Sequence, residues 1–413
     1  MVQLGSDLAD WVSAAPIAAP FFVLAIVSCL YTLLAVASVR RFRAAEAAVK
    51  PWKSPGVTVL KPLYGAEEGL YDNLLSFCRQ NYAGPVQILF GVHDADDPAA
   101  AVARRLVAAV RAGRIEGAAG KLTVELVVDP AQHGTNGKVS NLINLSSRIE
   151  NELVVIADSD IMVAPDYLCR LAAALQRPGV GIVTCLYRGM PLAGLWSRIG
   201  AMGVDYGFLP NVLTGLSLKM AEPCIGATIA LRRCTLDAIG GFAAIKDQLA
   251  DDYALGEAVR ERGLQVVLAD FVVGHAHSET EFSEVWRRDM RWARTIRSLN
   301  PAGYFGTAVT FPVGWALLAL LASGFAPEAA VLAGAALLCR TILQDQVDER
   351  FEAAGCRHPL WLGPVRDLFS FAIFLGSFVP GQVHWRGRDY ALGEDGVMEP
   401  VGVDGEAAEA EVA

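Results

Sequence analysis

An uncharged run of 23 residues, Ile17 to Val39, constrains what this chain can fold into more than any other feature. A helix of that length crosses the hydrocarbon core of a bilayer, where all backbone polar groups must be paired within the helix. Three arginines, Arg40, Arg41 and Arg43, follow the run at once, and acidic residues precede it. Because basic flanks favour the cytoplasmic side, we expect a membrane anchor over residues 1–40 whose C-terminal end lies in the cytoplasm. The acidic N-terminal flank disfavours a cleaved signal peptide.

The rest of the chain has the composition of a large folded domain with further membrane segments. The protein has 413 residues, of which 53% are hydrophobic, and a mean hydropathy of +0.36. This length and composition allow a large folded domain and membrane segments in the same chain. A formal charge of −9 argues against nucleic acid as the main partner. The eight cysteines form no Cys-x-x-Cys pair, so we expect reduced thiols and not a disulfide framework or a zinc site.

After a linker over residues 41–56, short apolar segments alternate with helical patterns. Strands are expected at 57–60, 86–91, 122–128 and 153–157, and helices at 70–79 and 99–112. This alternation predicts an α/β domain with a mostly parallel central sheet, in which ligands bind at the carboxyl ends of the strands.

Two carboxylates follow the fourth of these strands. The apolar residues 153–157 run directly into Asp158 and Asp160. Alternation along an extended segment turns both side chains toward one side, as oxygen ligands for Mg²⁺ or Mn²⁺ that leave positions open for a diphosphate. The alternative is an Asx-turn, in which the acidic side chains accept hydrogen bonds from backbone amides.

Polar loops follow the second and third strands. Asp94, Asp96 and Asp97 come after the second strand, at the same expected edge of the sheet as Asp158. A Gly-rich turn after the third strand carries Lys138 and Asn141 and could hold a nucleotide phosphate, although its spacing is not that of a Walker loop. The alternative is a polar loop that caps the helix beginning near residue 140.

A pair of adjacent acidic residues, Asp251 and Asp252, marks a further candidate site. Adjacent carboxylates repel each other, so one of them is expected to have a raised pKa and to accept a proton near neutral pH. The alternative is an acidic first turn of the helix that runs to Arg260, where the helix dipole favours negative charge. Both interpretations hold if only one of the two faces a cleft.

A basic helical strip lies between the α/β pattern and the C-terminal apolar segments. On a helix Arg291 shares one face with Arg287 and Arg294, and it also lies beside Arg288. Such a strip can bind a diphosphate through paired guanidinium groups. It can equally form a basic belt beside a membrane, with Trp292 among the lipid head groups.

The C-terminal part, 301–392, is expected to be membrane-associated. Thr307–Phe325 and Ala329–Leu343 predict a helical hairpin that crosses twice. A third crossing by Leu368–Val379 would place the basic segment after it outside, so we expect a re-entrant or interfacial helix there. Residues 393–413 form an acidic, Gly- and Ala-rich tail that is expected to be disordered.

These motifs, in this order, resemble the ceramide glucosyltransferase family of membrane-anchored glycosyltransferases with a GT-A catalytic domain. The resemblance covers 57–300, which would form a cytoplasmic catalytic domain, together with the anchor and the hydrophobic end. The matching positions are Lys61-Pro62-Leu63 at the start of the domain, Asp97, Asp158 and Asp252 in three aspartate motifs, Lys138 and Asn141 in an Asn-x-Lys-x-x-Asn-Leu stretch, and Arg288 to Trp292 in a (Q/R)xxRW signature.

The resemblance implies an inverting sugar transfer from a UDP-sugar to a lipid hydroxyl at the inner (cytoplasmic) membrane. Asp252 would be the catalytic base, and Asp158 and Asp160 would hold a divalent cation (Mg²⁺ or Mn²⁺). The donor-binding residues would be Asp94, Asp96, Asp97, Lys138, Asn141, Arg288, Arg291 and Trp292, with Trp292 also lining the acceptor pocket. The sequence of several stretches is most similar to the hopanoid-biosynthesis branch of the family. This similarity implies N-acetylglucosamine as the transferred sugar and bacteriohopanetetrol as the acceptor. Ceramide with UDP-glucose is the alternative, ahead of a processive polysaccharide synthase or a non-catalytic scaffold.

Overall fold

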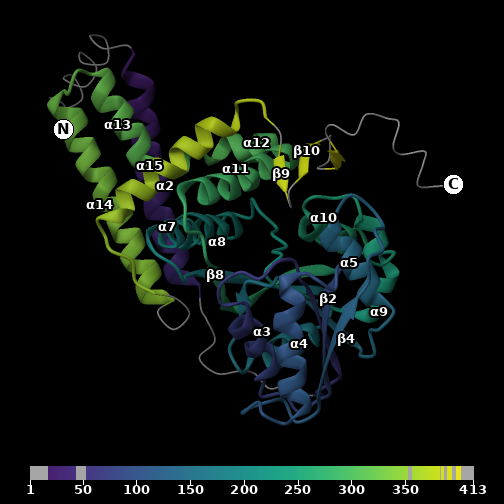
Figure 1. Cartoon of the computed structure of the whole chain (residues 1–413). Coiled ribbons are helices and arrows are strands. Elements are labelled where there is room, and N and C mark those ends of the chain that lie inside the picture. The colour runs from purple at the N-terminus through teal and green to yellow at the C-terminus, as the bar shows by residue number, and fades with distance from the viewer. Residues whose placement is uncertain are drawn as a thin grey trace. The chain divides into compact units, whose positions relative to one another are not determined.

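The computed structural model describes residues 17–42, 53–351, 356–381, 383–385, 388–392 and 397–400. The chain divides into two compact units, which are described separately (Figure 1). Unit 1 comprises Met1–Phe42, Arg198–Ala221 and Glu281–Pro380, and unit 2 comprises Arg43–Ser197, Glu222–Thr280 and Gly381–Ala413. Residues 198–221 and 281–300, which the sequence places in the catalytic domain, therefore group with the helices of unit 1.

Unit 2 is built on a mixed sheet with the strand order β3-β2-β1-β4-β7-β6-β8-β5. The strands are β1 (Val57–Pro62), β2 (Val86–Val92), β3 (Leu122–Val128), β4 (Leu153–Ile156), β5 (Ile161–Met162), β6 (Val180–Pro191), β7 (Ile229–Arg232) and β8 (Gln265–His277). Strands β3, β2, β1 and β4 are parallel, whereas β7 runs antiparallel to both β4 and β6. The expected α/β class is confirmed. The expected parallel pairing covers the part of the sheet where strands and helices alternate, and β5 and β7 lie outside that repeat.

Helices cover both faces of the parallel strands (Figure 1). They are α3 (Leu70–Cys78), α4 (Pro98–Arg111), α5 (Gly137–Ser146), α6 (Tyr167–Leu175), α9 (Arg233–Ala238) and α10 (Asp251–Glu261), with a 3-10 turn η2 (Phe242–Ile245). Strand β1 is buried along its whole length, as expected for a strand covered on both faces. Leu60 of β1, Leu142 of α5 and Leu255 of α10 belong to one core cluster. This core fixes the first turns of α5 and α10 relative to the ends of β1 and β4.

The C-terminal residues of unit 2 form a small antiparallel sheet. It consists of β9 (Val383–Trp385), β10 (Arg388–Leu392) and β11 (Met398–Pro400), and Val397 makes a single β-bridge with Gln248. The sequence predicts disorder from residue 393, but the apolar pair at 397–398 interrupts the acidic composition and allows pairing with β10. The rest of the predicted tail, 393–396 and 401–413, and residues 43–52 of the predicted linker lie outside the described residues.

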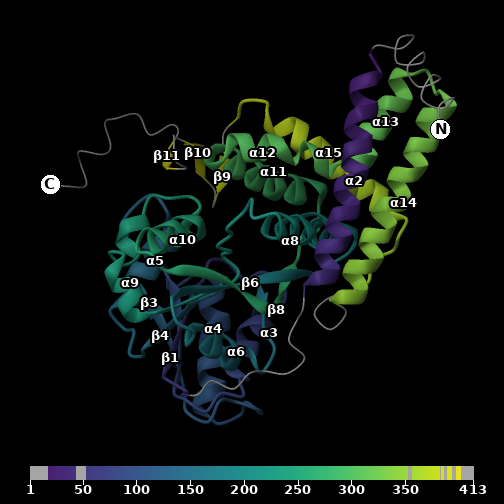
Figure 2. The same ribbon diagram turned by 180° about the vertical axis from the view of Figure 1, so that it is seen from behind.

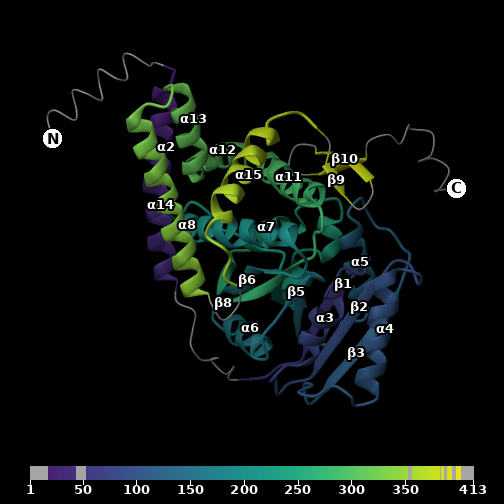
Figure 3. The ribbon, with the colours of Figure 1, turned by 60° about the vertical axis from the view of Figure 1, so that its left-hand side comes forward.

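Unit 1 is helical. Its elements are α2 (Ala19–Arg41), α7 (Leu195–Gly203), a π-helix η1 (Val204–Phe208), α8 (Leu209–Ser217), α11 (Phe282–Leu299), α12 (Pro301–Gly306), a 3-10 turn η3 (Thr307–Thr310), α13 (Pro312–Ala322), α14 (Pro327–Arg350) and α15 (Leu362–Ser377). Helices α2, α13 and α14 lie side by side (Figure 2), and α15 packs on α11 (Figure 3).

Among the described residues, α2 and α14 are long and apolar enough to cross a membrane. Helix α2 corresponds to the expected N-terminal anchor. The first half of the expected C-terminal hairpin differs, because Pro301 and Pro312 each begin a new helix and the two parts meet at a bend of 69°. These two parts form a third span only if the bent pair is counted as one segment. Helix α15 has 16 residues, short of a full span.

A buried contact between Asn141 and Gly91 fixes α5 against β2. The Asn141 Nδ2 group donates to the carbonyl oxygen of Gly91 over 2.8 Å, and its side chain is buried. A Cβ atom at residue 91 would lie 2.0 Å from Asn141 Oδ1 and 3.0 Å from Leu145 Cδ1. Only glycine leaves room for this contact.

We therefore predict that Gly91→Ala destabilises the protein by about 1–3 kcal/mol, the usual cost of overpacking a core. Thermal unfolding of the purified protein in detergent measures the effect. Gly120→Ala is the matched control, because a Cβ atom there meets no atom within 4 Å. Equal melting temperatures for the two variants would contradict the packing argument.

Candidate active site

Lys138 joins the first turns of two helices to the end of β4. Its Nζ atom lies 2.9 Å from Asp158 Oδ1 and 3.0 Å from Asp251 Oδ2. The side chain of Asn136 caps α5 by accepting hydrogen bonds from the backbone amides of Lys138 and Val139, which fixes the position of the lysine. Burial opposes the charge on Lys138, but Asp158 and Asp251 raise its pKa well above the usual value. The ammonium group therefore stays protonated between the two carboxylates.

Asp252 lies beside this ion pair in the first turn of α10. Its Oδ2 atom accepts a hydrogen bond from the backbone amide of Gly226 over 2.8 Å. A Cβ atom built on Gly226 would lie 3.2 Å from Asp252 Oδ2 and 3.6 Å from Asp158 Oδ2, so both carboxylates flank this glycine. Burial, followed by the charge of Asp251, raises the pKa of Asp252 to about 6. The raised pKa expected for one of the adjacent pair thus falls on Asp252.

Asp158 and Asp160 have different partners. Asp158 turns toward Lys138, whereas Asp160 Oδ2 lies 3.1 Å from His275 Nε2. Burial raises the pKa of Asp158 against the effect of Lys138, although water screens this shift because 37% of the side chain is exposed. For Asp160, burial acts in the same sense, but the charges of His275 and Lys61 outweigh it and lower the pKa.

The acidic residues suit a divalent cation that takes part of its ligands from the substrate. In the described part of the chain, no group of three or more His, Cys, Asp or Glu side chains could hold a metal by itself. Mg²⁺ commonly uses one or two carboxylates and completes its coordination with phosphate and water. Asp158 and Asp160 provide that number, and Oδ1 of Asp160 is buried with no hydrogen-bond partner among the described residues. The donor set therefore fits such an ion.

Lys61 supports the acidic residues from inside the sheet. Its side chain is fully buried, lies over the ring of Phe77 at 3.8 Å and donates to the main-chain oxygen of Asp158 over 2.5 Å. Burial lowers the pKa of Lys61 to about 7, against the opposing charges of Asp160 and Asp158. The sequence marks Lys61 only as part of the opening motif, because a single lysine in an apolar strand does not reveal its partner.

A chain of polar contacts on β8 continues from Asp160. His275 Nδ1 lies 2.9 Å from His277 Nε2, and His277 Nδ1 lies 3.4 Å from Glu279 Oε2. Sequence reasoning missed these residues. The signal was present, since His275 and His277 are two positions apart at the carboxyl end of a strand and share a face.

The aspartates after β2 have contacts within their own loop and with the loop after β1. Asp97 caps α4 by accepting from Ala99 N over 2.8 Å and also accepts from Gly65 N over 2.9 Å. The Oδ1 atom of Asp94 accepts from Asp96 N over 2.9 Å, and both of these side chains are exposed. Within the described residues, no hydrogen bond or ion pair joins the three to the Asp158 cluster. Asn141 points instead toward Gly91.

The basic strip lies on α11 in unit 1. Arg288 Nη2 pairs with Asp289 Oδ1 at 3.0 Å, and Arg288 Cζ lies 5.3 Å from the centre of the Trp292 ring. Asp289 Oδ2 also pairs with Arg366 of α15 at 2.7 Å. Burial opposes ionisation of Asp289, but Arg366 and Arg288 lower its pKa. Arg291 is half-buried on the same helix.

Comparison with known proteins adds a family match. A family model described as Glycosyl transferase family 21 matches residues 20–398. Ceramide glucosyltransferase 1 of Caenorhabditis elegans is 24% identical over 250 residues, which cover 60% of this chain and 51% of the relative. Ceramide glucosyltransferase 3 of the same organism is 23% identical over 279 residues, covering 67% and 58%. The chain thus spans between half and three fifths of the length of these curated relatives.

Two solved structures show a weak similarity to this chain. The mannosyltransferase PcManGT from Pyrobaculum calidifontis, in complex with GDP-Man and Mn²⁺, has a TM-score of 0.47 at 20% identity, covering 87% of this chain and 99% of that one. S. aureus TarS 1-349, in complex with UDP-GlcNAc, has a TM-score of 0.35 at 14% identity, covering 84% and 100%.

The raised pKa of Asp252 predicts a pH-dependent stability. Because the folded state holds the proton up to about pH 6 and the unfolded chain only up to about 4, wild-type stability falls as pH rises through this window. Asp252→Asn removes this loss, which for two pKa units is about 2.7 kcal/mol, so its melting temperature should exceed that of the wild type at pH 7.5 by about 5–10 °C.

The gap should close as the pH is lowered to about 4, where Asp252 is protonated in the folded wild type. Calorimetric scans between these pH values measure it. Asp237→Asn, at an exposed aspartate, should show no such gap. A gap for Asp252→Asn that stays constant with pH would contradict the prediction.

Proposed function

Because the chain belongs to glycosyl transferase family 21, we propose that it transfers a sugar from a UDP-sugar to the hydroxyl group of a membrane lipid. The reaction is a single displacement at the anomeric carbon with inversion of configuration. The observation that carries the proposal is the arrangement of Asp252 and Asp158 on either side of Gly226, next to the ammonium group of Lys138. This arrangement would bring a general base and a positive charge for phosphate binding into one site.

Asp252 is the proposed general base. Two backbone amides, those of Gly226 and Tyr253, hold its carboxylate in place. With a pKa of about 6, the group is ionised at neutral pH and basic enough to take the proton of the acceptor hydroxyl as the bond to the sugar forms. Such a group typically contributes about 10²–10⁴-fold to the rate.

The remaining residues bind the donor. A divalent cation on Asp158 and Asp160 would neutralise charge on the leaving diphosphate. Lys138 keeps its proton and supplies a fixed positive charge beside these oxygens. Asp97, with Asp94 and Asp96, is proposed to bind the uridine end. From the resemblance of the sequence, Arg288, Arg291 and Trp292 are also proposed to contact the donor, and Trp292 the acceptor. Asn141, proposed with them from the sequence, has its side chain buried against Gly91 and would act by positioning α5.

A pair of substitutions tests these roles. Asp252→Asn should lower turnover by about 10²–10⁴-fold while the affinity for UDP in the presence of Mn²⁺ changes little. Asp158→Ala should instead abolish the Mn²⁺-dependent part of UDP binding in calorimetry, because it removes a cation ligand. Normal transfer by Asp252→Asn would remove the proposed base, and unchanged Mn²⁺-dependent binding by Asp158→Ala would remove the proposed cation site.

Two acceptors are in competition. The resemblance of the sequence to the hopanoid branch supports bacteriohopanetetrol as acceptor and N-acetylglucosamine as the sugar. The names of the curated relatives support the second candidate, ceramide with UDP-glucose. Both are uncharged lipids with free hydroxyl groups, and both suit a chain with helices, such as α2 and α14, that could span a membrane.

Mass spectrometry of lipids from cells with and without the protein decides between the two. We expect a glycosylated hopanoid to disappear when the protein is absent and to return with the wild type but not with Asp252→Asn. Loss of a glycosylceramide would assign the second acceptor. A long polysaccharide product or unchanged lipids would contradict a lipid glycosyltransferase.

A further inference from the structure

Gly226, which lies between the carboxylates of Asp252 and Asp158, belongs to a loop that precedes β7. Residues 222–228 form this loop, called here the Gly226 loop, and contain no helix or strand. The backbone amide of Gly226 donates to Asp252 Oδ2 over 2.8 Å. The position of the Asp252 carboxylate therefore depends on the contacts that hold the loop in place.

The hydroxyl group of Thr184, on β6, bonds twice to the residue directly before Gly226. Its Oγ1 atom donates to the carbonyl oxygen of Ile225 over 2.9 Å and accepts from the backbone amide of Ile225, also over 2.9 Å. Both residues are buried, and the Thr184 side chain completely so. Because water does not reach these groups, the hydroxyl is the partner that satisfies the Ile225 amide.

The sheet explains why a side chain makes this contact. The antiparallel pairing of β6 with β7 runs to Thr184 and Ile229. The loop before Ile229 lies outside this ladder, so its buried backbone groups need other partners. On its other side, β6 shifts its register against β8 between Thr184 and Leu186. Such irregularities often redirect side chains next to active sites, and here the redirected side chain continues the hydrogen bonding where the ladder ends.

Other contacts hold the two sides of the Gly226 loop. Cys224 packs directly on α10, since a Cβ atom built on Gly256 would lie 2.7 Å from Cys224 Cβ. At the other side, Thr228 Oγ1 lies 3.0 Å from the hydroxyl oxygen of Tyr167. These contacts fix where the loop begins and ends, whereas the Thr184 hydroxyl fixes the peptide groups next to Gly226.

We infer that Thr184 is a positioning residue for the proposed base. Its hydroxyl holds Ile225 against β6 and thereby aims the Gly226 amide at Asp252. That Asp252 is the base of a sugar transfer rests on the function proposed above.

The proposed cation ligand Asp158 is held by different contacts. Its carboxylate pairs with Lys138, and its main-chain oxygen accepts a hydrogen bond from Lys61. Neither contact involves the Thr184 hydroxyl. Loss of this hydroxyl should therefore reduce turnover and leave donor binding largely intact.

Three substitutions isolate the hydroxyl group. Thr184→Val keeps the branched shape of the side chain but leaves the buried amide of Ile225 without its partner, which favours movement of the loop away from β6. Thr184→Ser keeps the hydroxyl and is the conservative variant. Thr58→Val is the matched control, because the Thr58 side chain is also fully buried and accepts from a backbone amide, that of Asn151, over 3.3 Å. Thr58 lies near the start of β1, at the opposite end of the parallel strands from the acidic residues.

The first readout is hydrogen exchange of the peptide spanning residues 222–228, measured on the full-length protein in detergent without substrate. Thr184→Val should raise its exchange rate by about tenfold or more relative to the wild type, because the loop opens locally. Thr184→Ser and Thr58→Val should exchange there like the wild type. An unchanged exchange rate in Thr184→Val would overturn the inference.

The second readout is turnover at saturating substrates, measured as UDP release from UDP-N-acetylglucosamine with bacteriohopanetetrol and from UDP-glucose with ceramide. Thr184→Val should lower kcat by about 10–100-fold, since a displacement of about 1 Å in a reacting group can cost about 10²-fold. Its affinity for UDP with Mn²⁺ should stay within about twofold in calorimetry. Thr184→Ser should restore most of the turnover, and Thr58→Val should lose stability without losing turnover.

The two readouts separate this inference from the proposed function. If Thr184→Val loosens the loop and the wild type glycosylates neither lipid, the contact stands and the proposed reaction fails. If the wild type transfers sugar and Thr184→Val does so at the rate of Thr58→Val, the reaction stands and the positioning role fails. A parallel loss of UDP affinity in Thr184→Val would indicate a disordered site and not a displaced base, and would also contradict the inference.

Discussion

The position of Lys138 between Asp158 and Asp251 is the constraint on which the rest of unit 2 depends. Without the ammonium group, two carboxylates from α10 and one from the end of β4 would repel each other in a half-buried site. The backbone is arranged to hold the lysine there. Asn136 caps its helix and also donates through Nδ2 to the carbonyl of Gln248 over 2.7 Å. The Asn136 side chain thus connects the turn that carries Lys138 to the loop that leads into Asp251 and Asp252, so the first turns of α5 and α10 are held together.

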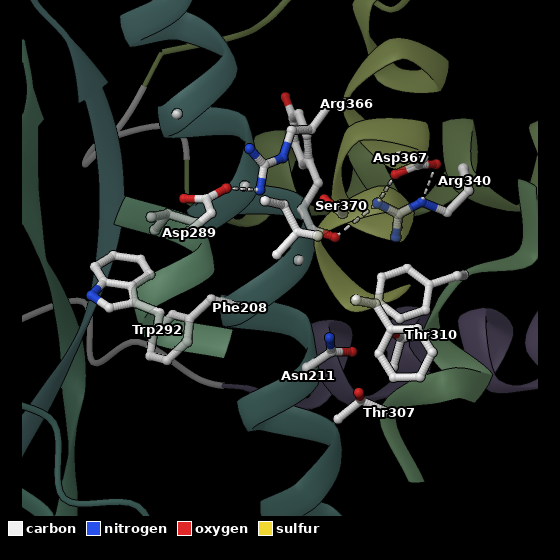
Figure 4. Close-up of a pocket in the computed structure, with 18 of the residues that line it drawn as sticks. Phe208, Asn211, Asp289, Trp292, Thr307, Thr310, Arg340, Arg366, Asp367 and Ser370 are labelled. Atoms are coloured by element: carbon white, nitrogen blue, oxygen red, sulfur yellow. Dashed lines mark hydrogen bonds and ion pairs between the residues drawn. The ribbon is translucent and has the colours of Figure 1, made fainter. Parts of the chain in front are cut away.

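The two units use buried charge in opposite ways. In unit 2, carboxylates outnumber the cations beside them. Burial, together with the charge of Asp251, raises the pKa of Asp252, and one oxygen of Asp160 has no hydrogen-bond partner among the described residues. Such a site attracts protons and cations. In unit 1, buried carboxylates are instead paired with guanidinium groups: Asp367 with Arg340 and Asp289 with Arg366 (Figure 4), and Asp289 also with Arg288.

Local patterns in the sequence predicted the parallel strands of the first half of the sheet and the position of Asp158 directly after β4, because a strand and the loop after it are encoded by neighbouring residues. The raised pKa near Asp252 was also predictable, since the two carboxylates are adjacent. The partners of these groups were not. His275 lies 115 residues after Asp160 in the chain, and periodicity within a short window does not report such pairings. Arg340 did stand out inside an apolar run, but only the fold shows that Asp367 neutralises it.

The β-bridge between Val397 and Gln248 connects the C-terminal part of the chain to the loop before the acidic pair. Gln248 is the residue whose carbonyl receives the Asn136 amide, so the last described strand touches the same loop that positions the acidic pair. A protease that trims the protein upstream of residue 397 would remove that bridge while leaving Asp158, Asp251 and Asp252 in the chain. Loss of mass at the C-terminus during purification is therefore a change to the support of this acidic cluster and not a harmless shortening of a tail.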